Sequence, residues 1–507
     1  MFSRATTPRP VGNPEPRTVT ETPHLSRLGL YTLQSGVGLE DKRTVVCEEA
    51  GQSVPLVTVD YFLNSVAPGL RPEINVHAVL QKLRDHGDII GDRWTLFPSD
   101  PKDSDEHENV TFKPFEELIQ TIASASRCKS VHPTLQLINN PYACPESSHR
   151  DNRSRPDSYA ILTPGEDGSQ DRPLWIDIGG TGEYKKGDAE KDRVDNARKI
   201  MWSMHHCMAN DPRRRFTFGW TIENTEMRLW HCNRSKRIVT YPFNFVQDHT
   251  SLAHFFLSLI YGDQTEIGWD PTMAIVDIGG GKEPQYDITV RSDSEKERVY
   301  RTVKMISGVG AESVQGRGTR VWLAVRIVKG KLRGVPVVLK DSWIDHDRKR
   351  EAIILEEIND APHCEELVPF ARKVFLTVEA HGDVHIDRQV DHTCELIMRV
   401  VMKPKRAKPF SVRAGTGFIS LTTRHEARKP EPTDFDDKVH YRIVFKEQCK
   451  PINEETSLRL IFKALGQTVT DDAWCWLGTP GREPNKYTGG SIWEYKTCGL
   501  RVCEKDE

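Results

Sequence analysis

Hydrophobic positions recur every three or four residues in the first part of the chain. The segment 56–96 contains the runs VDYFLNSVAPGL and INVHAVLQKLRDHGDII, and EELIQTIASA follows at 116–125. This spacing places apolar side chains on one side of an α-helix. We therefore predict a helical segment over residues 46–130. Residues 1–45 are predicted to be a disordered tail, because polar residues and proline dominate their first half.

From residue 159 the hydrophobic runs become shorter and are separated by polar turns. Runs such as YAILTP, LWIDIGG and FTFGWTI are typical of strands. The longer runs VDNARKIMWSMHHCMA at 194–209 and LAHFFLSLIY at 252–261 predict helices. We therefore predict a mixed α/β domain over residues 131–275.

A third region begins at residue 285, where strand-like runs lie close together. YDITV, SVQGRGTRVWLAVRIV and VPVVLKDSWI precede a predicted helix, DRKREAIILEEI at 347–358. A polar insertion over 390–437 separates them from the strand-like YRIVFKEQCKPI, and SLRLIFKAL begins a helix after it. We predict five strands around one helix over 285–470. The predicted fold class is thus α+β, with a helical N-terminal segment, a mixed α/β domain and this five-stranded lobe.

The composition excludes several functions. The chain has 507 residues, with 70 Lys and Arg against 73 Asp and Glu, so net charge gives no attraction to nucleic acid or membrane. No hydrophobic run approaches the roughly 18 residues of a membrane span. The eleven cysteines are scattered, and no Cys/His cluster has zinc-finger spacing, so we expect no structural zinc.

The third region contains a pattern suited to binding phosphates. GRGTRV at 316–321 has the form GxGxxV, in which Gly316 and Gly318 would let the backbone approach phosphate groups. Lys340 follows near the end of a hydrophobic strand, and the next helix offers Glu351, or alternatively Glu356, to hold its ammonium group. Each element has an ordinary alternative: a tight hairpin, a lysine at a strand edge, and a solvated helix face.

Longer strings resemble the fungal-type protein kinase family over residues 50–470. They include MWSMHHCMANDPRRRFTFGWTIENTEMRLWHCNRS at 201–235, GRGTRVW, VLKDSWID and YRIVFKEQCKPI. The resemblance implies a protein-kinase-like small lobe, ATP and Mg²⁺ as cofactors, and phosphoryl transfer to Ser or Thr of a protein substrate inside the cell, in the cytoplasm or nucleus. It also implies roles for the nucleotide-site residues. Gly316 and Gly318 would cover the phosphates beside Val321, Lys340 would orient them, Glu351 would anchor Lys340, and Glu447 and Cys449 would meet the adenine.

The resemblance ends near Thr470. The family continues with a catalytic-loop Asp and a magnesium-binding Asp, whereas 471–507 contains no HRD, DLE or DFG string. We therefore expect most of the large lobe to be missing, this chain to be inactive as given, and 471–507 to be an aberrant tail, explained by a reading-frame slip near residue 470. A non-catalytic binding fragment or scaffold is the alternative.

A second motif lies in the predicted α/β domain. Asp157 precedes one strand, and Glu183 and Lys185 follow as ExK, which is the PD…(D/E)xK pattern of restriction-endonuclease-like folds. Asp157 and Glu183 could hold Mg²⁺, with Lys185 beside the attacked phosphate. Basic residues at 193–215 could meet a phosphate backbone. The ordinary interpretation of this motif is a turn and a solvated Glu–Lys pair. Nucleic-acid processing is therefore only an alternative function, and we expect no nucleic-acid partner.

Overall fold

The computed structural model describes residues 38–49, 53–126, 130–148, 152–164, 173–277, 284–292, 296–360, 375–397, 410–411, 437–451, 457 and 501–502. The chain divides into two compact units. One comprises Gly29–Gln448, and the other combines Met1–Leu28 with Cys449–Glu507. In the second unit, β22 (Lys450–Pro451) pairs antiparallel with β23 (Arg501–Val502). The helix predicted to begin with SLRLIFKAL lies outside the described residues except for Ser457.

The first half of the larger unit, here called the central module (residues 39–270), is built on a mixed sheet. Its main strand order is β2-β10-β9-β8-β7-β6-β5, and β11 pairs with β9. β7 and β8 run parallel, as do β10 and β2, and the other neighbours are antiparallel. The strands are β2 (Leu56–Val57), β5 (Leu135–Asn139), β6 (Ser158–Leu162), β7 (Ile178–Lys185), β8 (Phe216–Glu223), β9 (Glu226–Asn233), β10 (Arg237–Thr240) and β11 (Phe243–Asn244).

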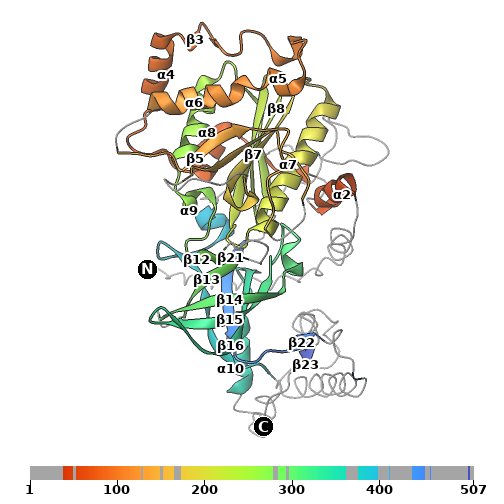
Figure 1. Cartoon of the computed structure of the whole chain (residues 1–507), viewed down its shortest axis with the longest axis vertical. Coiled ribbons are helices and arrows are strands. Elements are labelled where there is room, and N and C mark those ends of the chain that lie inside the picture. The colour runs from red at the N-terminus through yellow and green to blue at the C-terminus, as the bar shows by residue number, and fades with distance from the viewer. Residues whose placement is uncertain are drawn as a thin grey trace, which may run out of the picture. The chain divides into compact units, whose positions relative to one another are not determined.

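Helices cover both faces of this sheet (Figure 1). On one face lie α4 (Val76–His86), α6 (Pro114–Ser126) and α8 (His249–Tyr261), which share an apolar core with β8. On the other face lie α7 (Glu190–Asn210) and α2 (Leu39–Glu49), which share a second core with β9 and β10. The shorter elements are α3 (Val59–Tyr61), η1 (Phe62–Val66), β3 (Ile89–Ile90), β4 (Arg93–Trp94), η2 (Pro101–Asp103), α5 (Glu108–Thr111), η3 (Trp175–Asp177) and α9 (Gln264–Ile267).

Local sequence explains where these helices begin and end. The side chain of Asn75 caps α4 by accepting a hydrogen bond from the amide of Ala78, and Gly87 ends the helix with a φ of 85°. The helical pattern predicted through Ile90 is therefore interrupted at Gly87, and Ile89–Ile90 form β3. α2 covers residues 39–45, which the sequence assigned to the disordered tail.

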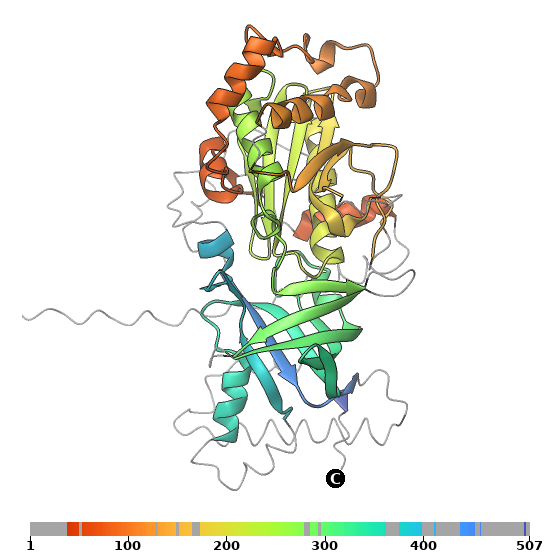
Figure 2. The same cartoon turned by 60° about the vertical axis from the view of Figure 1, so that its left-hand side comes forward.

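The second half of the larger unit, here called the antiparallel module (residues 273–445), contains a seven-stranded sheet. Its order is β12-β13-β14-β15-β16-β21-β17, and all neighbours are antiparallel. Figure 2 shows α10 (Glu351–Asn359) beside this sheet. The strands are β12 (Met273–Asp277), β13 (Gln285–Arg291), β14 (Glu297–Ser307), β15 (Arg320–Val328), β16 (Lys331–Asp345), β17 (Val378–Asp383) and β21 (Lys438–Phe445).

The short elements of this half are the hairpin β18 (His385–Ile386) and β19 (Gln389–Val390) and the π-helix η5 (Thr393–Ile397). In addition, β20 (Phe410–Ser411) pairs with β1 (Ser53–Val54) of the central module.

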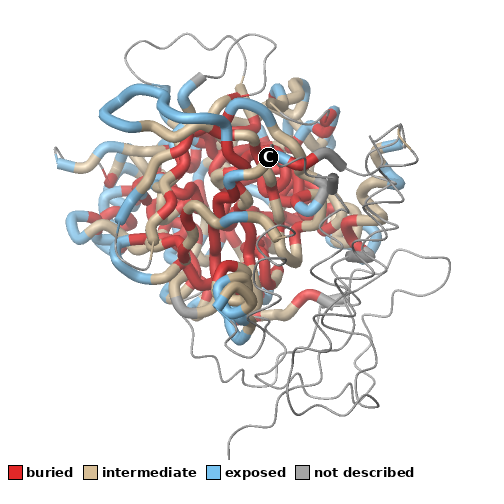
Figure 3. The backbone as a smooth tube through the Cα atoms, turned by 90° about the horizontal axis from the view of Figure 1, so that it is seen from below, coloured by how far each residue is buried: buried red, intermediate tan, exposed pale blue. Residues whose placement is uncertain are grey.

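The sheet has more strands than the five predicted. The sequence patterns indicate none of β12, β14 and β17. In β14 only Tyr300 and Thr302 are fully buried, and charged residues alternate with them, so the strand's apolar signal is weak. The predicted strand from Ser313 begins only at Arg320, because residues 313–319 form a loop. Figure 3 shows that buried segments gather in the interior, with exposed segments toward the outside.

A buried chain of charged side chains joins the two modules. His440 lies between two carboxylates, with Nε2 at 2.8 Å from Asp341 and Nδ1 at 3.2 Å from Asp391. Two arginines extend the chain into the central module. Arg215 of that module binds Asp391 at 2.6 and 2.9 Å, and Arg442 binds both Asp341 and Asp270. All six groups are nearly inaccessible to solvent, so the contact between the modules is specific as well as tight.

Candidate functional site

Lys340 and Glu351 form an ion pair in the antiparallel module. Lys340 Nζ lies 2.6 Å from Glu351 Oε2, and the lysine side chain is mostly buried. Glu351 is the first residue of α10, and Arg350 fixes this end by binding Asp383 of β17 with two hydrogen bonds of 2.8 and 2.9 Å. The structure therefore brings together the lysine and the first of the two glutamates that the sequence offered.

The other candidate, Glu356, lies one turn and a half further along α10. Its carboxylate pairs with His381 Nε2 at 3.5 Å rather than with Lys340. Among the described residues, the two glutamates thus have different partners, and Glu351 is the one that pairs with the lysine.

Lys340 belongs to a row of side chains on the α10 side of the sheet. Val321 on β15 is its direct cross-strand partner, and Ile443 on β21 is its partner on the other side. Val321 packs against an apolar cluster that contains Ile443 and Ala352 of α10. The lysine ammonium is therefore held beside an apolar surface, and a carboxylate fixes its position.

The loop between β14 and β15 carries Gly316 and Gly318. Its backbone is bound to the central module at several points. The amide of Gly316 donates to the carbonyl of Arg234 at 2.9 Å, and Arg234 Nη1 donates to the carbonyl of Ser313 at 3.0 Å. Val314 has no exposed surface and belongs to the apolar core formed by α2 and α7. In this arrangement the Gly316 amide is already used by a protein carbonyl.

Gly318 is required here by a close approach. Its φ is 54°, and a Cβ atom would lie 2.8 Å from the guanidinium carbon of Arg234. Gly318 therefore packs closely against the central module, and its predicted contact with phosphate stays a prediction.

The two predicted adenine contacts differ in what surrounds them. The Glu447 carboxylate accepts hydrogen bonds from the amide of Thr377 at 2.7 Å and its hydroxyl at 2.6 Å, so it joins the end of β21 to the start of β17. Cys449 is buried and belongs to the second compact unit. The adenine contacts predicted for Glu447 and Cys449 stay predictions.

The family assignment rests on a match across both modules. The sequence profile described as fungal protein kinase matches residues 157–471, which is more than half of the chain. The chain belongs to the fungal protein kinase family. No curated protein and no solved structure matches it.

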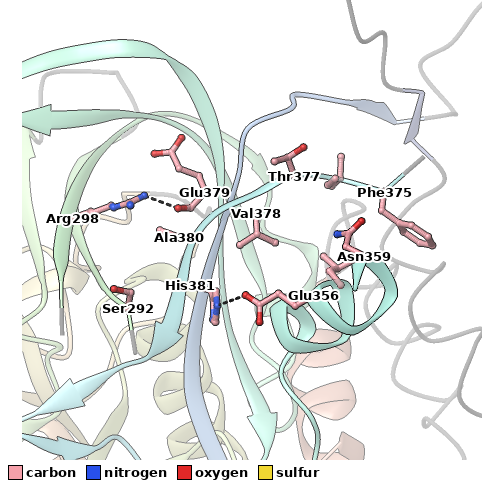
Figure 4. A pocket seen from close by; sticks show the side chains of 12 residues that line it. Ser292, Arg298, Glu356, Asn359, Phe375, Thr377, Val378, Glu379, Ala380 and His381 are labelled. Carbon is pink, nitrogen blue, oxygen red and sulfur yellow. Dashed lines mark hydrogen bonds and ion pairs between the residues drawn. The ribbon is translucent and has the colours of Figure 1, made fainter. Parts of the chain in front are cut away.

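For a fungal protein kinase family member, cavities near the lysine are of interest. Figure 4 shows a cavity of about 630 Å³ between β17 and the C-terminal half of α10. Arg298 and the His381–Glu356 pair lie on its wall, whereas Val321, Lys340 and Glu351 do not line it. This cavity is therefore separate from the Lys340–Glu351 pair.

The match begins at Asp157, the first residue of the second candidate site. Asp157 Oδ2 accepts a hydrogen bond of 2.8 Å from the amide of Tyr184, which places Asp157 beside β7. Glu183 is buried, and the hydroxyl of Ser203 donates to its carboxylate at 3.5 Å. Burial and the neighbouring Asp157 raise the pKa of Glu183 well above its usual range.

Lys185 and the basic residues after it have partners within the protein. Lys185 Nζ lies 3.1 Å from Glu108 and 3.2 Å from Asp195, and these carboxylates raise its pKa despite burial. The basic groups at 193–215 are likewise engaged: Arg193 with Glu226, Arg198 with Glu40, Lys199 with Asp195, His206 with Ser147, Arg213 with Asp211 and Arg215 with Asp391. The predicted contact surface for a phosphate backbone is therefore committed to internal contacts.

Among the described residues, no helix is long and apolar enough to cross a membrane.

Proposed function

We propose that the antiparallel module is the nucleotide-orienting lobe of a protein kinase. It would contribute to the family reaction, which is ATP-dependent phosphoryl transfer to a protein hydroxyl. The observation that carries the proposal is the Lys340–Glu351 pair at 2.6 Å. In protein kinases a strand lysine held by a helix glutamate must be in place for catalysis. The strand order β14-β15-β16-β21-β17, with α10 entering between β16 and β17, supports the same reading.

The residues fit a nucleotide chemically. Lys340 offers an ammonium group to phosphate oxygens, and Glu351 keeps it from rotating away. Val321 offers an apolar contact beside it for a purine ring. Mg²⁺, when bound, would neutralise charge on the phosphates. No described residue is assigned as its ligand.

Nucleotide binding tests the proposal. Because these residues supply one side of a nucleotide site, we expect ATP to bind the 507-residue chain with a Kd of about 1 mM or weaker, which corresponds to roughly −4 kcal/mol. Titration followed by phosphorus NMR should show saturable broadening that Lys340→Met and Glu351→Gln both remove. Lys331→Met, at an exposed position of the same strand, is the matched control. Binding that is indifferent to Lys340 would refute the proposal and favour a non-catalytic binding fragment or scaffold.

A further inference from the structure

Two histidines and an aspartate meet where three distant segments of the antiparallel module come together. His346 follows β16, His392 precedes η5 and Asp437 precedes β21. One nitrogen from each histidine and one oxygen of Asp437 all lie within 4.8 Å of one another. His392 Nδ1 is 3.1 Å from Asp437 Oδ2, and the two imidazole rings have their centres 4.9 Å apart.

The surrounding backbone holds these groups in place. The amide of His346 donates to the carbonyl of Asp437 at 2.9 Å. The other carboxylate oxygen of Asp437 accepts from the Thr393 hydroxyl at 3.2 Å and the Cys394 amide at 3.1 Å. These contacts fix the carboxylate as the outer-shell partners of metal ligands do. His346 is exposed, so an ion could reach the group from solvent.

We infer that His346, His392 and Asp437 form a binding site for a divalent transition-metal ion of the zinc class. Two imidazole nitrogens and one carboxylate oxygen are a known donor set for zinc, with the fourth position left to water. Mg²⁺ and Ca²⁺ prefer sites made of oxygen alone. Ligands at about 2.0–2.2 Å from zinc in a tetrahedron lie a little over 3 Å apart. The His392–Asp437 pair already has this spacing, and the ligand atom of the exposed His346 lies within 4.8 Å of both.

No motif in the sequence indicates this site, because its ligands are far apart along the chain rather than clustered. A bound ion would link the end of β16 to the start of β21. In addition, Asp391, which accepts hydrogen bonds from Arg215 of the central module, directly precedes His392. Bound zinc would therefore stabilise the contact between the two modules.

The test uses the full chain after treatment with a chelator and titrates zinc chloride against a chromogenic competitor. We expect one saturable site, and His346→Ala should weaken it at least about 100-fold, more than loss of an outer-shell partner does. Thr393→Val, which removes such a partner, should weaken it about tenfold. The matched control is His385→Ala, a partly exposed histidine of the same module, which should bind zinc like the wild type.

Two further measurements keep the result interpretable if a variant is unstable. Free zinc at a hundred times the Kd should shift the unfolding equilibrium of the wild type about 100-fold toward the folded state, and Mg²⁺ should not. Cobalt(II) in place of zinc should give a d–d spectrum without a thiolate charge-transfer band, which excludes binding by cysteines. No saturable binding, thiolate ligation, or equal zinc affinity for wild type and His346→Ala would each overturn the inference. An ordinary His392–Asp437 ion pair would then remain.

A second inference concerns the loop that carries Gly316 and Gly318, and it rests on the proposed function. We propose that the central module holds this loop in a conformation that cannot bind the phosphates of a nucleotide, so that release of the loop increases nucleotide affinity. Val314 is fully buried in the central-module core, and the Gly316 amide is bound to Arg234. Backbone amides of such a loop would have to leave these partners before they could bind phosphate.

Val314→Asp tests this, because an unpaired carboxylate is not stable in an apolar core. We expect the variant to bind ATP at least about tenfold more tightly, since more molecules have a competent loop. Trypsin should also cleave after Arg317 faster than in the wild type. Val335→Asp, at an exposed position of β16, is the control, and Val314→Ala should give a smaller change in the same direction if Val314→Asp fails to fold.

The outcomes separate this inference from the proposed function. If Lys340→Met removes ATP binding but neither Val314 variant strengthens it, the loop inference fails and the proposed function stands. If Lys340→Met changes nothing in the wild type and in Val314→Asp, both fail.

Discussion

His440 is the centre of a buried row of alternating charges, and its protonation should control the stability of the chain. Both ring nitrogens face carboxylates, Asp341 and Asp391, which accept hydrogen bonds but do not donate them when ionised. Arg215, Arg442 and Asp270 complete the row. With His440 protonated, three cations balance three anions. With His440 neutral, a buried site would carry one uncompensated negative charge.

These contacts raise the pKa of His440 from 6.5 to about 9, because the two carboxylates outweigh the opposing effect of burial. The Trp343 ring is stacked on the imidazole at an interplanar angle of 8°, which also favours the cation. A tenfold change in proton affinity corresponds to about 1.4 kcal/mol, so protonation contributes on the order of 3 kcal/mol. Because the folded-state pKa is the higher one, this stability is present below pH 6.5 and is lost as the pH rises through about 9.

We therefore expect the contribution of His440 to the free energy of unfolding, measured by urea denaturation as the difference between the wild type and His440→Gln, to fall by about 2 kcal/mol between pH 6.5 and about pH 8.5. His440→Gln should be less stable than the wild type by roughly 3–5 kcal/mol at pH 6.5, since it leaves a buried charge unpaired. The pH dependence that comes from other buried groups, such as Glu183 and His231, should be the same in both proteins. The range stops near pH 8.5 because burial raises the pKa of Cys47 to about 11 and of Cys207 to about 12. Ionisation of these thiols in the unfolded state would add a second destabilisation above about pH 9.

His385→Gln is the control for this experiment. His385 lies in the same module but outside the row of charges, with Nδ1 at 2.9 Å from the carbonyl of Asp383. The variant should keep the pH dependence of the wild type. The reasoning is refuted if the stability difference between the wild type and His440→Gln does not change over this range.

Three further predictions follow from the other sites. Glu183→Gln should be at least as stable as the wild type at neutral pH. The raised pKa of Glu183 means that wild-type stability falls as pH rises from 4.5 toward the folded-state pKa, whereas glutamine cannot ionise. If Mg²⁺ raises the wild-type melting temperature and this variant abolishes the rise, Asp157 and Glu183 are a metal site. Gly318→Ala should lower the free energy of unfolding by about 1–3 kcal/mol, measured by thermal or urea denaturation, since the φ of Gly318 is 54° and Arg234 leaves no room for a Cβ. Gly334 also has a positive φ but open space around it, so Gly334→Ala should lower the free energy of unfolding by less. The purified 507-residue chain should not transfer radiolabelled phosphate to protein above background, because 471–507 contains no HRD or DFG string; turnover that depends on Lys340 would contradict this.

The part of the site that the sequence predicted is the part encoded over short distances. Lys340 and Glu351 are eleven residues apart, and a hydrophobic strand followed by a helix is enough to bring them together. Helices such as α6 and α7 were likewise predictable, because their apolar spacing is regular. The α+β class follows from the same patterns.

The features that the sequence did not predict depend on contacts between distant segments. Gly316 and Gly318 fit a phosphate-loop pattern, yet the pattern carries no information about Arg234, some 80 residues earlier, which binds the same loop. The basic residues of α7 suggested a nucleic-acid surface because their acidic partners, such as Glu40 and Glu226, come from other elements. Residue type alone therefore did not indicate whether these basic side chains face solvent or an acidic partner.

The buried charges also bear on why the family profile spans two modules. The match over residues 157–471 includes Arg215 and Asp270 on one side of the junction and Asp341, His440 and Arg442 on the other. If the modules separated, each side would carry unpaired charged groups that are now inaccessible to solvent, together with the exposed apolar surface around Val314. Two of these ion pairs, Arg215–Asp391 and Arg442–Asp270, cross the junction, and breaking either one would leave buried charges unpaired, which is strongly destabilising. The central module therefore fixes two parts of the antiparallel module: the start of β21 around His440 and the loop that precedes β15. For this reason it is best regarded as part of the functional unit.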